Sequence, residues 1–445
     1  MTDIPAISDH QPVMTPLRTA VIGALIVAIG PMSLSLYSPA MPALVKVFGT
    51  TPSMLNLTMT TYFFGYAFSQ LVCGPLSDAY GRRSVALAFF TFYLLGSVIA
   101  IVAPNIEILL AARIIQGIGV AAGAAVSRAL VRDQFSGLSA TKIMNLIALM
   151  LAVGPAVSPM LGGMILGAFG WHWIFLAMAL YGVVVLLTLG FATGETNRAP
   201  DPARARPAQV LRNYASLIGN RSYIAPVVLL GCTVGAIYTL SPLMPFLLID
   251  RLGLSSTGFG FAMIAQTGSY ALGSFCTAWL LKLVHERTVV RIGIGFVLVA
   301  ALGFAVGPRL LPLSVPVIVV PVSLLAFGMA LINPSTTMKA LSGVAALAGA
   351  ASAFMGFMQI GGGLLGSGVS ALLFRDPVTA YATVVPIMLG IALLTAVTMR
   401  SPQPQVSAAA GDAHLEDLEL ALDPAGVIGA SGDQIEARLK AKSNL

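Results

Sequence analysis

An arginine stands inside a long apolar segment, where charged side chains are rare. The segment covers residues 106–130 and contains the run Arg-Ile-Ile-Gln-Gly-Ile-Gly, which starts at Arg113. A guanidinium group in the middle of a bilayer is costly, so Arg113 is expected to face the protein interior and to be paired. A structural role, with backbone carbonyl groups as partners, and a role in transport both stay open.

A second candidate is the polar stretch at residues 74–83, Gly-Pro-Leu-Ser-Asp-Ala-Tyr-Gly-Arg-Arg. Gly81 permits a tight turn, and Asp78 can accept hydrogen bonds from free backbone donors at a helix start. Arg82 can pair with a carboxylate. A loop that is merely basic would explain the arginines but not the aspartate or the spacing of Gly74 and Gly81. The stretch is therefore predicted to have a function.

A third pattern combines proline with small residues in the fifth apolar segment, at Gly154, Pro155, Gly162 and Gly163. Proline removes a helical hydrogen-bond donor, and glycine lets a neighbouring helix approach closely. Taken alone, this pattern fits a packing kink as well as it fits a functional site.

Polar and aromatic side chains also occur inside segments that are otherwise apolar. Each can simply bond to a neighbouring helix, so none is a site by itself. Together they predict a wide, uncharged, aromatic cavity that binds neutral or weakly charged lipophilic molecules. The predicted substrate-binding residues are Ser35, Tyr37, Tyr62, Tyr66, Gln116, Asn145, Tyr238, Gln266, Tyr270, Asn333, Phe357 and Gln359.

Proton exchange is best served by a buried carboxylate with a raised pKa, and no acidic residue lies near the middle of an apolar segment. Glu107 lies near one end of its segment, and Asp133 follows the other end of the same segment. The three cysteines and four histidines are far apart, which predicts no metal site. Without a catalytic or nucleotide-binding motif, the chain is predicted not to be an enzyme and to need no cofactor.

Composition sets the elements that hold these residues. Of 445 residues, 57% are hydrophobic and 9% charged, and the mean hydropathy is +0.90. A soluble domain has roughly 25% charged residues, so lipid must surround this chain. An all-α membrane protein with twelve transmembrane helices is predicted, since helices satisfy their own backbone in lipid. The expected spans are 18–46, 53–75, 84–103, 106–130, 141–167, 171–193, 222–249, 258–283, 289–307, 312–337, 343–374 and 378–399.

An internal repeat organises the spans into two six-helix halves. Residues 38–42, Ser-Pro-Ala-Met-Pro, return as Ser-Pro-Leu-Met-Pro at 241–245, an offset of 241 − 38 = 203 that superposes most later spans. Parallel six-helix repeats are typical of transporters with a central site. Lysine and arginine gather on one side, which places both termini in the cytoplasm. The predicted organisation is a cytoplasmic segment at 1–17, bundles at 18–193 and 222–399, a cytoplasmic linker at 194–221, and an acidic, mostly disordered tail at 400–445.

These motifs resemble those of the major facilitator superfamily over residues 20–400. The resemblance implies that Asp78 and Arg82, with Asp133 as partner, form a latch between the halves that stabilises the outward-facing state. It implies that Arg113 takes part in proton transfer, and that the pattern at 154–163 is the motif of the antiporter branch.

More narrowly, the chain is similar to drug exporters of the bicyclomycin- and chloramphenicol-resistance type. These exporters usually have an aspartate where Ser35 stands here, so the coupling acid is missing. The residues that carry the similarity are 37–42, 74–83, 131–133, 170–175, 241–242, 348–353, Gly356 and Gln359.

The resemblance implies an exporter of small lipophilic molecules in a bacterial inner membrane, driven by proton antiport through alternating access. Arg113 and Glu107 are the expected proton-coupling residues. The expected partners are the substrate, protons and the bilayer, with no nucleic acid, and the protein is expected to be a monomer. A metabolite exporter of the same fold and an uncoupled uniporter are the alternatives.

Overall fold

The computed structural model describes residues 12–197, 199–344 and 347–398. All regular structure in these ranges is helical. The long helices, in chain order, are α1 (Pro16–Tyr37), α3 (Pro52–Tyr80), α4 (Arg82–Ile101), α5 (Ile106–Arg132), α6 (Gly137–Phe169), α7 (Trp171–Phe191), α9 (Arg221–Pro245), α10 (Ser256–Leu280), α11 (Glu286–Leu310), α12 (Val315–Ser342), α13 (Ala348–Leu373) and α14 (Pro377–Thr398).

Short helices extend or connect the long ones. The turn η1 (Ser38–Ala40) and helix α2 (Met41–Val47) continue α1, and η3 (Phe246–Arg251), a π-helix, continues α9. The predicted linker contains η2 (Pro202–Ala205) and α8 (Pro207–Gly219), which the sequence analysis did not anticipate. Each predicted span has its counterpart among the long helices, so the twelve-helix fold is confirmed. Nine spans in the described part of the chain are apolar enough to cross a membrane by hydropathy, and the other three long helices are α3, α6 and α10.

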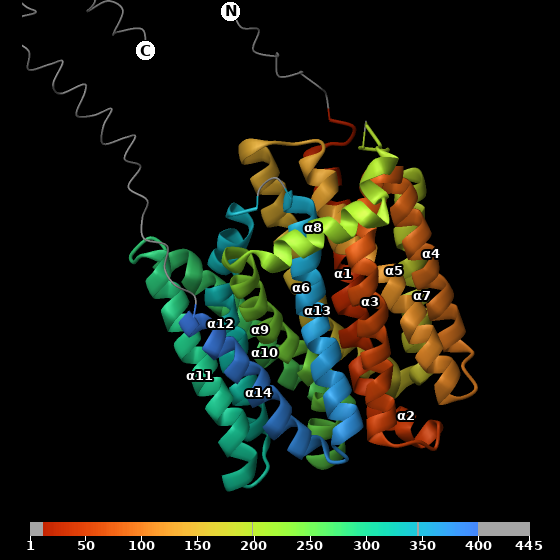
Figure 1. Cartoon of the computed structure of the whole chain (residues 1–445). Helices are drawn as coiled ribbons and strands as arrows, with labels where there is room; N and C mark the ends of the chain where they lie inside the picture. Colours follow the sequence, from red (N-terminus) through yellow and green to blue (C-terminus); the bar gives the residue numbers. More distant parts are fainter. Residues whose placement is uncertain (1–11, 198, 345–346, 399–445) are drawn as a thin grey trace, which may run out of the picture. The chain divides into compact units, whose positions relative to one another are not determined.

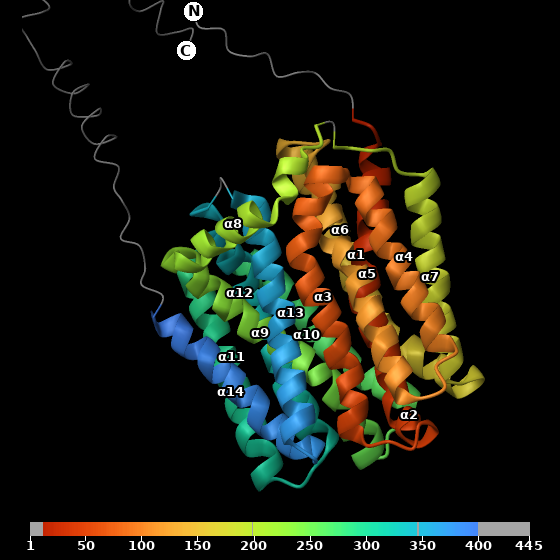
Figure 2. The same cartoon turned by 45° about the vertical axis from the view of Figure 1, so that its right-hand side comes forward.

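The helices pack into two groups of six. Helices α1, α3, α4, α5, α6 and α7 contact mainly one another, and so do α9 to α14 (Figures 1 and 2). Two pairs of helices make most of the contacts between the groups, α3 with α13 and α6 with α10. With the repeat offset of 203 residues, α3 corresponds to α10 and α6 corresponds to α13. The two pairs are therefore equivalent contacts of the two halves. Ser38 and Ser241, also 203 residues apart, meet where the halves touch, with Ser38 Oγ donating to the Ser241 carbonyl oxygen at 3.3 Å.

Prolines inside the helices leave carbonyl groups without their usual donors, and side chains supply replacements. Pro75 cannot donate to Leu71, whose carbonyl oxygen accepts instead from the Tyr214 hydroxyl of α8 at 2.6 Å. In the same way, the carbonyl oxygen of Ala330, four residues before Pro334, accepts from the Thr277 hydroxyl. The carbonyl oxygen of Ala382, four residues before Pro386, accepts from the Arg309 guanidinium. Hydrocarbon offers no hydrogen bonds, so such replacement lets helices continue through proline. The span predicted to end at residue 75 therefore continues to Tyr80.

Candidate functional site

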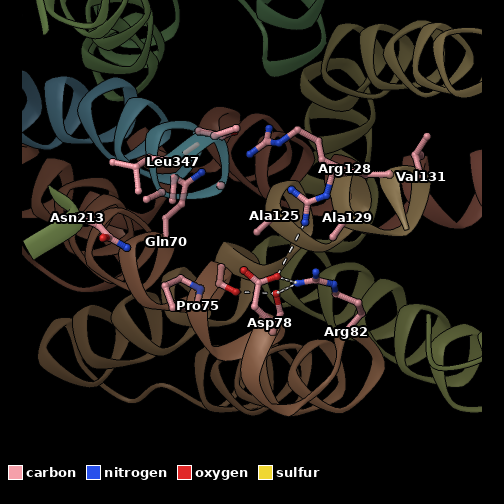
Figure 3. Close-up of a pocket in the computed structure, with 18 of the residues that line it drawn as sticks. Gln70, Pro75, Asp78, Arg82, Ala125, Arg128, Ala129, Val131, Asn213 and Leu347 are labelled. Carbon is pink, nitrogen blue, oxygen red and sulfur yellow. Dashed lines mark hydrogen bonds and ion pairs between the residues drawn. The ribbon is translucent and has the colours of Figure 1, made fainter. Parts of the chain in front are cut away.

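A cavity of about 770 Å³ lies between the two halves, at the end of the bundle where α8 lies. We call this the linker end. Its walls come from the last turns of α3 and α5, the start of α6, helix α8, and the start of α13 (Figure 3). The cavity is of the size that holds small organic ligands. Tyr214 is part of its wall, and burial raises the pKa of this hydroxyl to about 12, so Tyr214 keeps the proton that it donates.

At the rim of the cavity lies the charged cluster that the sequence singled out. Arg82 is 4% exposed, and its Nε donates to Asp133 Oδ2 at 2.9 Å. One terminal nitrogen, Nη1, donates to the Ser77 hydroxyl at 2.8 Å and forms an ion pair with Asp78. Arg132 lies 3.9 Å from the Asp78 carboxylate and is largely exposed. In this conformation the cluster joins α3, α4 and α5 of one half, and its role as a latch between the halves stays a prediction.

The start of the linker lies on this cluster through a residue that the sequence analysis missed. Glu195 accepts hydrogen bonds from the backbone N–H groups of Arg82 at 2.8 Å and Arg83 at 3.1 Å, and so caps the start of α4. Asn197 donates to the carbonyl oxygen of Asp78 at 2.9 Å. A carboxylate at a helix N-terminus satisfies free donors and suits the helix dipole. The sequence signal was a lone acid directly after the sixth apolar segment.

Gly81 is the single residue of the turn between α3 and α4. Its φ of +96° and ψ of 148° lie in a region that is essentially reserved for glycine, and an added Cβ would collide with the Glu195 carboxylate. We expect Gly81→Ala to lower the free energy of unfolding by about 1–3 kcal/mol. Thermal unfolding of the purified protein in detergent measures this. Gly74→Ala is the control, because the Cβ at Gly74 would meet only Ala353 at 4.0 Å; equal melting points for the two variants would contradict the expectation.

Arg113 is fully buried in the N-terminal half, as predicted, and its partners are side chains. The guanidinium carbon lies 4.3 Å from the ring centre of Tyr37 and 4.6 Å from that of Tyr62. Nη1 donates to Gln116 Oε1 at 3.0 Å, and Gln116 donates in turn to Ser97 at 2.8 Å. Two aromatic faces and an amide thus stabilise this cation. Within the described residues the Nε of Arg113 has no hydrogen-bond partner.

The other predicted substrate-binding residues are spread through the bundle. Tyr66 packs against Tyr62, while Tyr238 meets Phe63, and Phe357 meets Phe68, across the boundary between the halves. The remaining six are Ser35, Gln266, Asn333 and Gln359, which are half-buried, and Asn145 and Tyr270, which are exposed. In the described part of the chain none of the twelve belongs to the wall of the linker-end cavity. Their role in substrate binding stays a prediction.

The glycines of α6 lie against neighbouring helices, and Gly163 lies where the halves meet at the opposite end. A Cβ at Gly162 would collide with the carbonyl group of Leu36 in α1, and one at Gly163 with the carbonyl group of Ser256 in α10. Gly154 faces the side chain of Met32. The side chain of Pro155 lies outside the described part of the structure.

Further hydrogen bonds join the halves at the opposite end. The Ser53 hydroxyl donates to the Phe374 carbonyl oxygen at 3.2 Å, and Thr60 donates to Ser367 at 3.0 Å. Glu107 is exposed in the first turn of α5 at this same end, and its part in proton coupling stays a prediction.

Two six-helix halves with a cavity between them at one end define the class, a polytopic membrane transporter. Residues 23–367 match the Major Facilitator Superfamily, and the chain belongs to this family. It is 30% identical over 367 residues to the uncharacterized MFS-type transporter YdgK of Bacillus subtilis, covering 82% of this chain and 90% of the relative. It is 26% identical over 348 residues to the multidrug resistance protein MdtL of Shigella flexneri, covering 78% and 87%.

A solved structure has the same fold. It is that of a bacterial homolog of the human lysosomal transporter Spinster, in an inward-facing and unoccupied conformation. The TM-score is 0.63 at 13% identity, with 86% of this chain and 95% of the other covered. The narrower drug-exporter type that the motifs resemble is a proposal, because the family match identifies the superfamily.

Proposed function

We propose that this protein exports small lipophilic molecules through a bacterial inner membrane in exchange for protons. The observation that carries the proposal is the cavity between the halves at the linker end, opposite the end where α6 meets α10. A cavity reachable from one side, with the two halves joined at the other, suits alternating access. The linker end would face the cytoplasm, in line with its arginines, and the cavity would then load from inside the cell.

The similarity to MdtL and the glycines of α6 support export of drug-like compounds. The cluster of Asp78, Arg82 and Asp133 would bias the equilibrium between the two conformations, since it fixes the ends of three helices at the rim of the cavity. Arg113 and Glu107 are proposed to couple protons to this change.

One observation favours a second candidate, an uncoupled uniporter. The contacts of Arg113 are with Gln116, Met59 and the rings of Tyr37 and Tyr62, so no carboxylate among the described residues contacts the buried cation. A coupling group that binds and yields a proton near Arg113 would then have to be a tyrosine or lie elsewhere.

Inverted membrane vesicles test the proposal with N-phenyl-1-naphthylamine, a neutral lipophilic dye. We expect vesicles that contain the protein to accumulate the dye when their lumen is acidified, because export then points inward. A protonophore should remove this accumulation, with vesicles that lack the protein as the control. Equilibration of the dye that is faster than in the control, without accumulation and regardless of the protonophore, would identify the uniporter. Uptake no different from the control would contradict export.

A further inference from the structure

Arg128 lies in the wall of the linker-end cavity, five residues before the charged cluster's Asp133. It extends from α5 into the cavity and is exposed there, between Ala125 and Ala129 (Figure 3). The two aspartates of the cluster are held by Arg82, with Arg132 nearby. Arg128 makes no ion pair with a carboxylate in the described ranges. A guanidinium group that is not neutralised inside a bundle attracts an anion.

Gln70 adds an unused hydrogen-bond acceptor to the same cavity. Its side chain, on α3, is 3% exposed, and its amide oxygen Oε1 has no hydrogen-bond partner among the residues that the structure describes. An amide that is buried without partners costs free energy, which a ligand recovers when it bonds to the amide. Figure 3 shows the side chain extending into the space toward which Arg128 also extends.

The start of α13 is a second favourable feature for an anion. Residues 348–350, in its first turn, lie in the cavity wall. Leu347 precedes them at the N-cap and has no side-chain acceptor for the free N–H groups of this turn. The N-terminus of a long helix carries partial positive charge and free donors, which together suit an anionic oxygen.

The charges of the whole cavity agree with Arg128 and the start of α13. Among its described wall residues are three arginines, Arg82, Arg128 and Arg132, against one acid, Asp78. The rest of the wall includes Phe135, Met144, Val210 and Leu347, which offer apolar surface. A ligand that fits has a negative group beside an apolar body.

We infer that the exported substrates are amphiphilic organic anions, with one carboxylate or sulfonate group bound by Arg128. The first turn of α13 supplies further donors to that group, and the Gln70 amide oxygen can accept from an N–H or O–H group of the same substrate. The inference rests on the proposed export function for the direction of movement. It differs from the sequence-based prediction of an uncharged cavity for neutral or weakly charged molecules.

Two dyes with the same skeleton test the inference. The sulfonate is 8-anilinonaphthalene-1-sulfonate, and N-phenyl-1-naphthylamine lacks only that group. Binding is measured by fluorescence on purified protein in phosphatidylcholine nanodiscs, and the signal of empty nanodiscs is subtracted. No proton gradient is present, so the binding result does not depend on the outcome of the export assay. We expect the wild type to bind the sulfonate more tightly than the neutral dye, and Arg128→Gln to weaken sulfonate binding about tenfold or more while neutral binding stays unchanged.

Arg128→Lys should keep most of the sulfonate affinity, because the charge remains. If Arg128→Gln fails to fold, added salt replaces it: sulfonate binding by the wild type should weaken with salt while neutral binding does not. Equal affinity of the wild type for both dyes would overturn the inference, and so would an equal loss of both in Arg128→Gln. A sulfonate preference that vanishes when phosphatidylglycerol replaces phosphatidylcholine would assign the cavity to a lipid headgroup and also overturn it.

Discussion

Replacing Arg82 with alanine is expected to reduce transport more than tenfold and to lower the free energy of unfolding by about 3 kcal/mol. The Arg82 side chain is 5% exposed and bonds to Asp78, Asp133 and Ser77 at once. Its removal leaves two carboxylates close together in a half-buried place without their cation. Arg82→Lys should recover only part of the loss, because one ammonium group cannot match the geometry of the guanidinium fork. Thermal unfolding and dye accumulation in inverted vesicles measure both effects.

Arg132→Ala is the matched control for stability. Its side chain is 60% exposed, and its nitrogen atoms lie 3.8–3.9 Å from Asp78 and Asp133. An exposed pair of this kind contributes less than about 1 kcal/mol, so the melting point should change little. If the two alanine variants lower the melting point equally, the stabilisation comes from the positive charge of the region and not from the buried hydrogen bonds of Arg82.

The second large effect is expected from Gly163→Val in α6. A side chain at this position meets the backbone of Ser256, which cannot move away as a flexible side chain would. Extra atoms in a tight contact typically cost about 1–3 kcal/mol, and here they also push α6 away from α10. We expect the variant to lose most of its transport, and spin labels on α6 and α10 to report a longer distance at the end opposite the linker.

Gly167→Val is the matched control, since Gly167 lies one turn further along the same helix and an added Cβ there meets nothing within 4 Å. This variant introduces the same valine into α6 at a position that does not contact α10. Transport near the wild-type level is expected for Gly167→Val. If both valine variants lose transport equally, the helix contact is not what makes Gly163 necessary.

Much of the fold could be predicted from the sequence because lipid imposes a simple rule. Each apolar run of sufficient length must be a helix, and so Ile106–Arg132 and Trp171–Phe191 were found within a few residues. One error is the end of the second span, which was placed at Pro75. Pro75 lies inside α3 because Tyr214, 139 positions further along the chain, bonds to the carbonyl group that the proline leaves free. Nothing near Pro75 in the sequence could reveal that partner.

The candidate site was predictable in part. Arg113 had to be buried and paired, since a charge in hydrocarbon requires it, and the pairing of Asp78, Arg82 and Asp133 followed from their motif. The sequence did not predict which residues contact Arg113. These residues are Tyr37, Tyr62 and Gln116, which were predicted to line the substrate cavity.

The sequence by itself determined that this chain spans a membrane with twelve helices in two repeated halves, because composition, segment length and repeat offset are local or additive properties. Only the tertiary structure decided where the cavity lies and which charges it holds. Arg128 lies near the end of the predicted span 106–130, and packing turns it into the cavity while Arg82 binds the nearby carboxylates. Several arginines lie near each other in this region, and one of them is left without a carboxylate partner. Which one it is depends on distances between helices that are far apart in the chain, and a local sequence pattern does not encode these distances.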